Sequence, residues 1–354
     1  MSCKLREFLI VLIAAAMRRE RAAHHQRFVG CAVRTLLIVF IAAAAALPAH
    51  AQGWKPSKHV ELIVPFAPGA GVDVVARTMH AIWTSKRLVE TTSSVVNKPG
   101  GGGNIGMAYA AQHAGDPHYL VLGSATLLTN HIVGASKLSH VDFTPIAIVL
   151  GEHIVFSVRA DSPLKTGADL LRRIRSDPQS ISISIGSAAG NINHIAVASV
   201  AKAAGADAKR LKVVVFGSSG EGMTALLGGH VDVSVSTLGV IVPQIEAGKL
   251  RALAITTPRR LGGALANVPT WIEQGIPTEL TFWRGILGPK GLAADQVEFW
   301  ERVLATVSKS DEWQAMAREH AWDATFQGPR AMQAYLERDY AAERATLTEL
   351  GMAK

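Results

Sequence analysis

Two glycine-rich loops contain the residues of this sequence that are best suited to hold an anion. The first runs from Val64 to Asp73 (VPFAPGAGVD) and the second from Asn97 to Gly106 (NKPGGGGNIG). Glycine lets the backbone turn and approach a ligand closely, and exposed N–H groups at a helix start form an anion site. The alternative is a tight strand-to-helix turn without a ligand. We expect ligand contacts from these loops, with Asp73 also capping a helix, at Phe66, Pro68, Gly69, Ala70, Gly71, Asp73, Gly102, Gly103 and Asn104.

Two further loops, Gly186–His194 and Phe216–Gly222, are rich in small, hydroxyl and amide side chains that suit hydrogen bonding to a polar ligand. None of the four loops contains arginine, so a carboxylate would be held by N–H groups, hydroxyls and amides. Arg284 is a candidate for a direct ion pair with the ligand; the alternative is a hinge or surface arginine. Polar loop residues complete the expected site, namely Ser124, Thr126, Ser187, Asn193, His194, Ser218 and Gly220.

Catalytic and cofactor functions have weaker support in the sequence. Gly101, Gly103 and Gly106 fit the dinucleotide pattern G-x-G-x-x-G, but no acidic residue follows at the required distance. The segment around Ser218 misses the last glycine of a G-x-S-x-G nucleophile turn, since Glu221 stands there. The histidines show no H-x-H or H-E-x-x-H spacing. We therefore expect neither catalysis nor a cofactor or metal.

The elements that position these loops alternate between strand and helix. Val- and Ile-rich runs predict strands at 60–64, 94–96, 119–122, 146–150, 154–158, 181–185, 212–216, 231–236, 251–255 and 285–287. Helical stretches are predicted at 73–83, 105–112, 168–175, 194–204, 221–227, 294–307, 311–318 and 329–350. This alternation indicates an α/β fold with largely parallel sheets flanked by helices. Ligands of such sheets bind at the carboxyl ends of the strands.

Export is indicated by the first 51 residues. Leu36 to Leu47 is an unbroken run of twelve apolar residues, preceded by basic residues and followed by Ala49-His50-Ala51. This is the pattern of a cleaved signal peptide, with a retained membrane anchor as the alternative. Translation from Met17 and a periplasmic chain beginning at Gln52 are expected.

The composition of residues 52–354 excludes two classes of function. Seven of the 36 basic and two of the 28 acidic residues lie before residue 52, which leaves a net charge of +3 from the total of +8. That is an ordinary surface, so no nucleic-acid partner is expected. The cysteines, Cys3 and Cys31, both precede residue 52, which excludes disulfides and thiolate catalysis from the exported chain.

The sequence resembles the substrate-binding proteins of tripartite tricarboxylate transporters, the Bug family. The resemblance covers residues 55–354, and its matching segments occur in the family's order. They are Ile63–Asp73, Asn97–Gly106, Ala225–Asp232, Ala247–Ala254 and Val268–Thr270. Three segments depart from the family pattern and concern the ligand rather than the fold: Ala70 in place of glycine, Asn191-Ile192-Asn193, and Trp283-Arg284-Gly285.

The resemblance implies a two-lobed, type II-like periplasmic binding protein with a ligand cleft between the lobes. Lobe 1 is expected at 52–151 and 280–354, and lobe 2 at 152–279. The implied function is capture of a small organic carboxylate by a monomer that delivers it to the membrane permease subunits of a tripartite transporter. A sensor subunit that reports to a membrane kinase is the alternative, and an exported hydrolase using Ser187 or Ser219 with His194 is less favoured.

Overall fold

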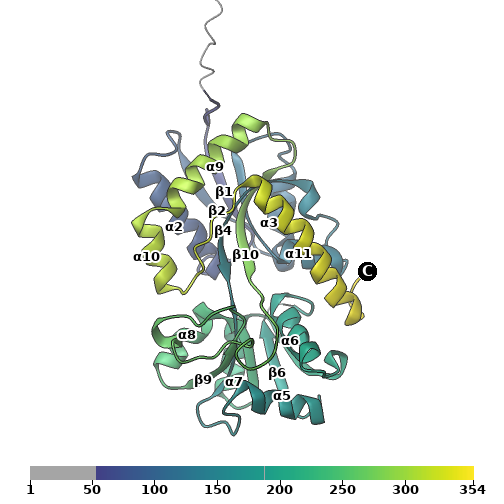
Figure 1. Cartoon of the computed structure of the whole chain (residues 1–354). Coiled ribbons are helices and arrows are strands. Elements are labelled where there is room, and N and C mark those ends of the chain that lie inside the picture. The colour runs from purple at the N-terminus through teal and green to yellow at the C-terminus, as the bar shows by residue number, and fades with distance from the viewer. Residues whose placement is uncertain (1–52, 187) are drawn as a thin grey trace, which may run out of the picture. The chain divides into compact units, whose positions relative to one another are not determined.

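The computed structural model describes residues 53–186 and 188–354 (Figure 1). Residues 54–354 form one compact unit. The predictions of a signal peptide, of translation from Met17 and of a ligand contact by Ser187 lie outside the described residues. Within the described part of the chain, no helix has both the length and the apolar character needed to cross a membrane.

The first sheet contains five strands in the order β2-β1-β3-β10-β4. The strands are β1 (Val60–Val64), β2 (Ser93–Asn97), β3 (Tyr119–Ser124), β4 (Phe143–Glu152) and β10 (Phe282–Pro289). β2, β1 and β3 are parallel, whereas β10 runs antiparallel to both β3 and β4. β10 is reversed because β4 leads the chain out of this sheet and β10 brings it back.

Helices cover both faces of the first sheet, because alternate strand residues point to opposite faces. α2 (Gly71–Ser85), α9 (Ala294–Ser308) and α10 (Asp311–Glu319) share one apolar core with one set of strand side chains. α3 (Asn104–Ala111), α4 (Thr126–Ile132) and α11 (Pro329–Glu349) pack with the other set. Figure 1 shows α2, α9 and α10 on one side of the strands and α3 and α11 on the other.

The second sheet has the order β7-β6-β8-β5-β9. Its strands are β5 (Ile154–Arg159), β6 (Ser182–Gly186), β7 (Lys212–Phe216), β8 (Val233–Thr237) and β9 (Leu250–Ile255). Its helices are α5 (Gly167–Ser176), α6 (Ile192–Ala203), α7 (Ser219–Leu227) and α8 (Leu238–Glu246). β6 is parallel to β7 and β8, and β5 is antiparallel to β8 and β9. Short 3-10 helices are η1 (Gly101–Gly103), η2 (His140–Asp142), η3 (Ala208–Arg210) and η4 (Gly263–Leu265).

The predicted α/β class and all ten predicted strands are confirmed, whereas two details were wrong. Four of the eight strand pairings are antiparallel, so the sheets are mixed and not largely parallel. The prediction also missed α4 and α8. Two segments connect the sheets: His153 between β4 and β5, and residues 256–281 between β9 and β10. The lobe boundaries expected after residues 151 and 279 fall near these segments and stay a prediction.

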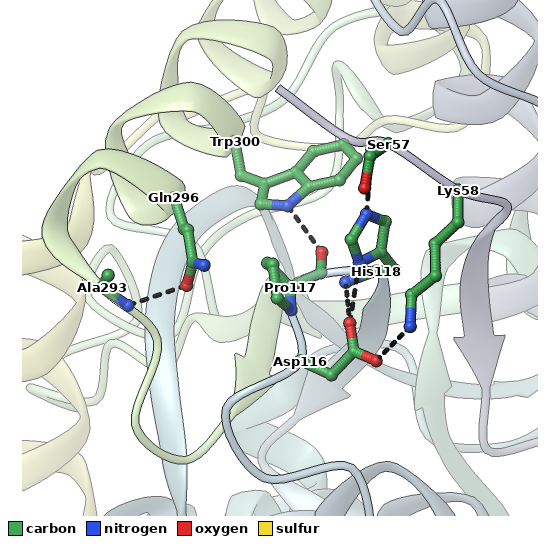
Figure 2. A network of polar contacts seen from close by, with 8 residues as sticks. All are labelled: Ser57, Lys58, Asp116, Pro117, His118, Ala293, Gln296 and Trp300. Carbon is green, nitrogen blue, oxygen red and sulfur yellow. Dashed lines mark hydrogen bonds and ion pairs between the residues drawn. The ribbon is translucent and has the colours of Figure 1, made fainter. Parts of the chain in front are cut away.

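A polar network fixes the edge of the first sheet at which β1 and β3 begin (Figure 2). The Asp116 carboxylate accepts from Lys58 Nζ at 2.8 Å and faces His118 Nδ1 at 2.7 Å, while Ser57 N–H donates to His118 Nε2 at 3.1 Å. Trp300 of α9 donates its indole N–H to the Pro117 carbonyl at 2.9 Å. The network ties the first described segment and α9 to the start of β3.

Replacing Asp116 with asparagine should lower the free energy of unfolding at pH 7 by about 1–2 kcal/mol. Burial opposes ionisation of Asp116, but hydrogen bonds from Lys58 and His118 outweigh it and lower its pKa from 3.8 to about 2. The stabilisation is therefore present above pH 3.8 and lost as the pH falls through about 2. Urea unfolding at pH 7 and pH 3 measures it. Glu298→Gln, at an exposed ion pair with Arg302, is the control and should cost less than about 1 kcal/mol; an equal loss at both pH values would contradict the prediction.

Candidate functional site

Both sheets have a topological switch point, and the predicted ligand loops lie there. In the first sheet, β1 and β3 are neighbours while β2 lies beyond β1. The loops that leave β1, β2 and β3 therefore meet at one edge, in front of α2, α3 and α4. In the second sheet, β6 and β8 are neighbours in the same way, and the loops into α6, α7 and α8 meet at its carboxyl edge.

The loop between β6 and α6 lies against helices that belong to the first sheet. A Cβ atom on Gly190, in the loop between β6 and α6, would lie 3.0 Å from Val133 Cγ1 and 3.5 Å from Leu347 Cδ2. Val133 follows α4 and Leu347 lies on α11, so both belong to the side of the first sheet. The predicted β6–α6 loop of the second sheet is therefore next to α4 and α11 of the first.

Asp73 holds the β1–α2 loop in shape. The residue is 2% exposed, and its carboxylate accepts 2.8 Å hydrogen bonds from Gly69 N–H, Arg77 Nε and Asn97 Nδ2. Burial opposes its ionisation, but the bonds from Arg77, Gly69 and Asn97 outweigh it and lower the pKa below 3.8. The prediction that Asp73 caps α2 is wrong, because the N-cap is Ala70 and no side chain caps that helix. Asp73 lies inside the first turn, where it fastens the loop to the helix and to β2.

The start of α2 has unpaired N–H groups. Those of Gly71 and Val72 donate to no acceptor in the described ranges, and Gly71 is exposed. Ala70 has φ −66° and ψ 155°, an ordinary conformation for any residue. The methyl group by which this chain departs from the family pattern is therefore accommodated without strain.

The backbone conformation before α3 explains why four consecutive residues there are glycine. Gly100, Gly101, Gly102 and Gly103 all have positive φ, at 126°, 60°, 64° and 98°, which other residues adopt only with strain. A Cβ on Gly103 would lie 3.3 Å from the ring of Phe66. The two predicted loops thus pack directly on each other.

Other predicted residues of this edge bond to neighbours within the first sheet's loops. Asn104 donates to the Ala135 carbonyl at 3.0 Å and accepts from Asn130 Nδ2 at 2.9 Å. Ser124 and Thr126 share a hydrogen bond of 2.8 Å between their hydroxyls. Pro68 and Gly69 are exposed. The prediction missed Asn130, whose side chain also donates to the Gly102 carbonyl at 3.0 Å.

On the second sheet, His194 presents one defined donor. Gly190 N–H donates to its Nδ1 at 3.0 Å, so in the neutral ring the proton sits on Nε2. Burial lowers the His194 pKa below 6.5 and so favours that neutral form. Asn193 is 4% exposed, and its Oδ1 has no hydrogen-bond partner in the part of the chain that the structure describes.

Side chains cap α6 and α7 of the second sheet, unlike α2, α3 and α8. Asn191 Oδ1 accepts from the N–H groups of Asn193 and His194 at 3.1 Å, and Ser218 Oγ accepts from Glu221 N–H at 3.2 Å. No side chain caps α2 or α3. Gly220 lies in the first turn of α7. The Ser218 hydroxyl is thus engaged in a helix cap, while α2 and α3 of the first sheet and α8 of the second start without a side-chain cap.

Arg284 lies at the same edge as the loops, with a charged partner. It is opposite Ser124 in the β10–β3 ladder, so both side chains are on the face that α2 covers. It forms an ion pair with Glu152, the last residue of β4. Sequence analysis missed Glu152, which is 132 positions away and carries no local signal.

A separate cavity of about 1020 Å³ lies beside the two segments that connect the sheets. His153, Thr257 and the segment from Arg259 to Leu265 form one part of its wall, and the end of α10 with Trp322 and Asp323 forms the other. None of the predicted ligand residues lines it. The connecting strands β4 and β5 stand between this cavity and the switch points in the strand order.

Comparison with known proteins gives consistent matches over most of the chain. Residues 75–321 match the family described as the tripartite tricarboxylate transporter family receptor. A UPF0065 protein from the tcbD–tcbE intergenic region of Pseudomonas sp. is 31% identical over 262 residues, which cover 72% of this chain and 74% of that protein. BugT of Bordetella pertussis is 28% identical, with coverage of 72% and 77%.

Solved structures share the fold. A TctC solute-binding protein from Polaromonas has a TM-score of 0.69 and 26% identity, covering 83% of this chain and 99% of its own. The structure of R. palustris Rpa4515 with adipate has a TM-score of 0.73 and 26% identity, covering 84% and 99%. These neighbours confirm the two-lobed α/β architecture.

Proposed function

Since the chain belongs to the tripartite tricarboxylate transporter family of receptors, we propose that this solute-binding receptor holds a small organic carboxylate between its lobes. The ligand would lie against the loops at the switch points and pass from there to the permease subunits of a tripartite transporter. Export to the periplasm fits this role. The family is a receptor family and not an enzyme class, and the family match favours transport over sensing.

The open start of α2 is the observation that carries the proposal. Its first N–H groups have no capping side chain, and Gly71 is exposed there. A helix start stabilises an anion by about 0.3–1 kcal/mol when exposed and about 2 kcal/mol when partly buried. Each hydrogen bond to a charged group adds about 1.5–3 kcal/mol. Three or four such contacts reach the roughly 8 kcal/mol of a micromolar complex.

The second lobe would complete the site by closing over the ligand. We propose that His194 donates from Nε2 and that Asn193, Ser218 and Gly220 border the ligand. Contact of one ligand with both lobes favours the closed state, because only that state makes both sets of bonds.

Isothermal titration of the refolded chain from residue 52 tests the proposal. Adipate is the first probe, since Rpa4515 holds it at 26% identity; succinate, malate, citrate, tricarballylate and benzoate follow. We expect at least one carboxylate to bind with a micromolar Kd. Folded protein that binds none of these carboxylates would contradict the proposal.

Gly103→Ala should weaken carboxylate binding by about tenfold or more. Alanine at this position would have to adopt a positive φ, which strains the backbone. Its methyl group would also lie 3.3 Å from the Phe66 ring, so the two loops would have to move apart. Gly115→Ala is the matched control, because it has φ +76° and no atom within 4 Å of the new Cβ. Both variants should lose about 1 kcal/mol of stability, and titration should separate them. Equal affinities in the two variants would contradict the assigned site.

A further inference from the structure

Glu152 and Arg284 form an incompletely satisfied ion pair at the edge of the first lobe. Their side chains are 10% and 12% exposed. Arg284 Nη2 contacts Glu152 Oε2, whereas Arg284 Nε, although buried, donates no hydrogen bond within residues 53–186 and 188–354. Buried polar atoms in native proteins nearly always have a partner. The pair therefore has capacity for one more acceptor at Arg284 Nε, and the Glu152 carboxylate can accept a further hydrogen bond because its two oxygens together offer about four acceptor sites.

The position of the pair relates it to the proposed site. Arg284 is beside Ser124 on the sheet face covered by α2, and Ser124 bonds to Thr126 at the start of α4. Glu152 ends β4 and is followed at once by the segment that leads to the second lobe. Both charges therefore lie at the lobe edge, next to the loops that would hold the ligand carboxylate.

We propose that Glu152 and Arg284 select organic acids that carry a hydrogen-bond donor, a hydroxyl or ammonium group, next to a carboxylate. This rests on the proposed function. The carboxylate of such a ligand accepts from Arg284, and its hydroxyl or ammonium donates to Glu152. A plain dicarboxylate brings a second negative charge toward Glu152 and has no donor for it. Glu152 is thus a specificity-determining residue. A site that contained only basic side chains would not distinguish a hydroxy acid from a plain dicarboxylate in this way.

Matched ligand pairs test this inference on the wild-type chain. Malate differs from succinate, and citrate from tricarballylate, by one hydroxyl group. We expect the hydroxy acid to bind about tenfold to a hundredfold more tightly in at least one pair, the range for one hydrogen bond to a charged group. Equal Kd values within both pairs would overturn the inference while the carboxylate receptor stands. No binding of any acid would instead overturn the proposed function.

Two variants assign the preference to its residue. Glu152→Gln should reduce the ratio of affinities to about threefold or less, because a neutral amide is a weaker acceptor than a carboxylate, and should improve succinate binding relative to malate. Glu298→Gln, the same change at an exposed ion pair on α9, should leave the ratio unchanged. A ratio unchanged in folded Glu152→Gln would show that the pair serves only to hold β4 and β10 together. Circular dichroism confirms folding before titration.

Discussion

Asp73→Ala is expected to destabilise the chain by about 2–4 kcal/mol and to weaken carboxylate binding by at least about tenfold. The substitution leaves the Gly69 N–H and Asn97 amide without their 2.8 Å acceptor. The β1–α2 loop would then lose the shape that keeps the start of α2 open. Because the Asp73 pKa is lowered below 3.8, its stabilisation exists above that pH and fades as the pH falls. Urea unfolding and titration on one preparation measure the two effects.

Asp169→Ala is the matched control for this prediction. Asp169 fastens the start of α5 in the same manner, accepting from the N–H groups of Lys165 and Thr166 at 3.0 and 2.9 Å. It lies away from the switch point, so stability should fall while the Kd stays within about twofold. Wild-type affinity in Asp73→Ala would show that the loop does not hold the ligand.

Asp339→Asn should stabilise the chain by about 2–4 kcal/mol at pH 8 and by little near pH 4. Burial raises the pKa of Asp339 from 3.8 to about 7. Burial also raises the pKa of Glu343, with the charge of Asp339 adding to it. The folded state thus keeps protons that the unfolded chain releases near pH 4. Stability is highest below that pH and falls as the pH rises to about 7.

The control for this prediction lies on the same helix. Glu337 occupies the exposed side of α11, so Glu337→Gln should change stability by less than about 0.5 kcal/mol at either pH. Glu343→Gln should act in the same direction as Asp339→Asn, since neither Glu343 oxygen has a hydrogen-bond partner in the described part of the chain. Urea unfolding at pH 4.5 and pH 8 measures the difference, and a gain that does not grow with pH would contradict the account.

Much of the fold follows from local sequence pattern. Val- and Ile-rich runs between Gly, Pro and Ser loops located every strand within a few residues, because such runs suit a buried sheet. α4 was missed because it has seven residues, and α8 because it contains Pro243. The antiparallel strands were missed because direction depends on where the chain leaves and re-enters a sheet. Local sequence does not indicate where the chain leaves or re-enters a sheet.

The candidate site, too, could be predicted only in part from local sequence. Glycine spacing identified the two loops of the first lobe, since positive φ leaves a local mark. The partners of Asp73 and Arg284 could not be predicted from local sequence, because they are distant along the chain. Strand pairing brings Asn97 close to Asp73 and Glu152 close to Arg284. The half-buried Asp339 and the buried Glu343 of α11 did have a local signal. They are one helical turn apart, and Glu343 shares a helix face with Leu336 and Leu347.

Hydrogen exchange with and without a saturating carboxylate tests the central claim most directly. If the ligand binds the open helix start, the amides of Gly71 and Val72, which lack acceptors in the described residues, should exchange at least about tenfold more slowly in the complex. The glycine run 100–103 should be protected with them. A ligand that binds but protects only the cavity around Thr257 and Trp322 would contradict the assignment of the site.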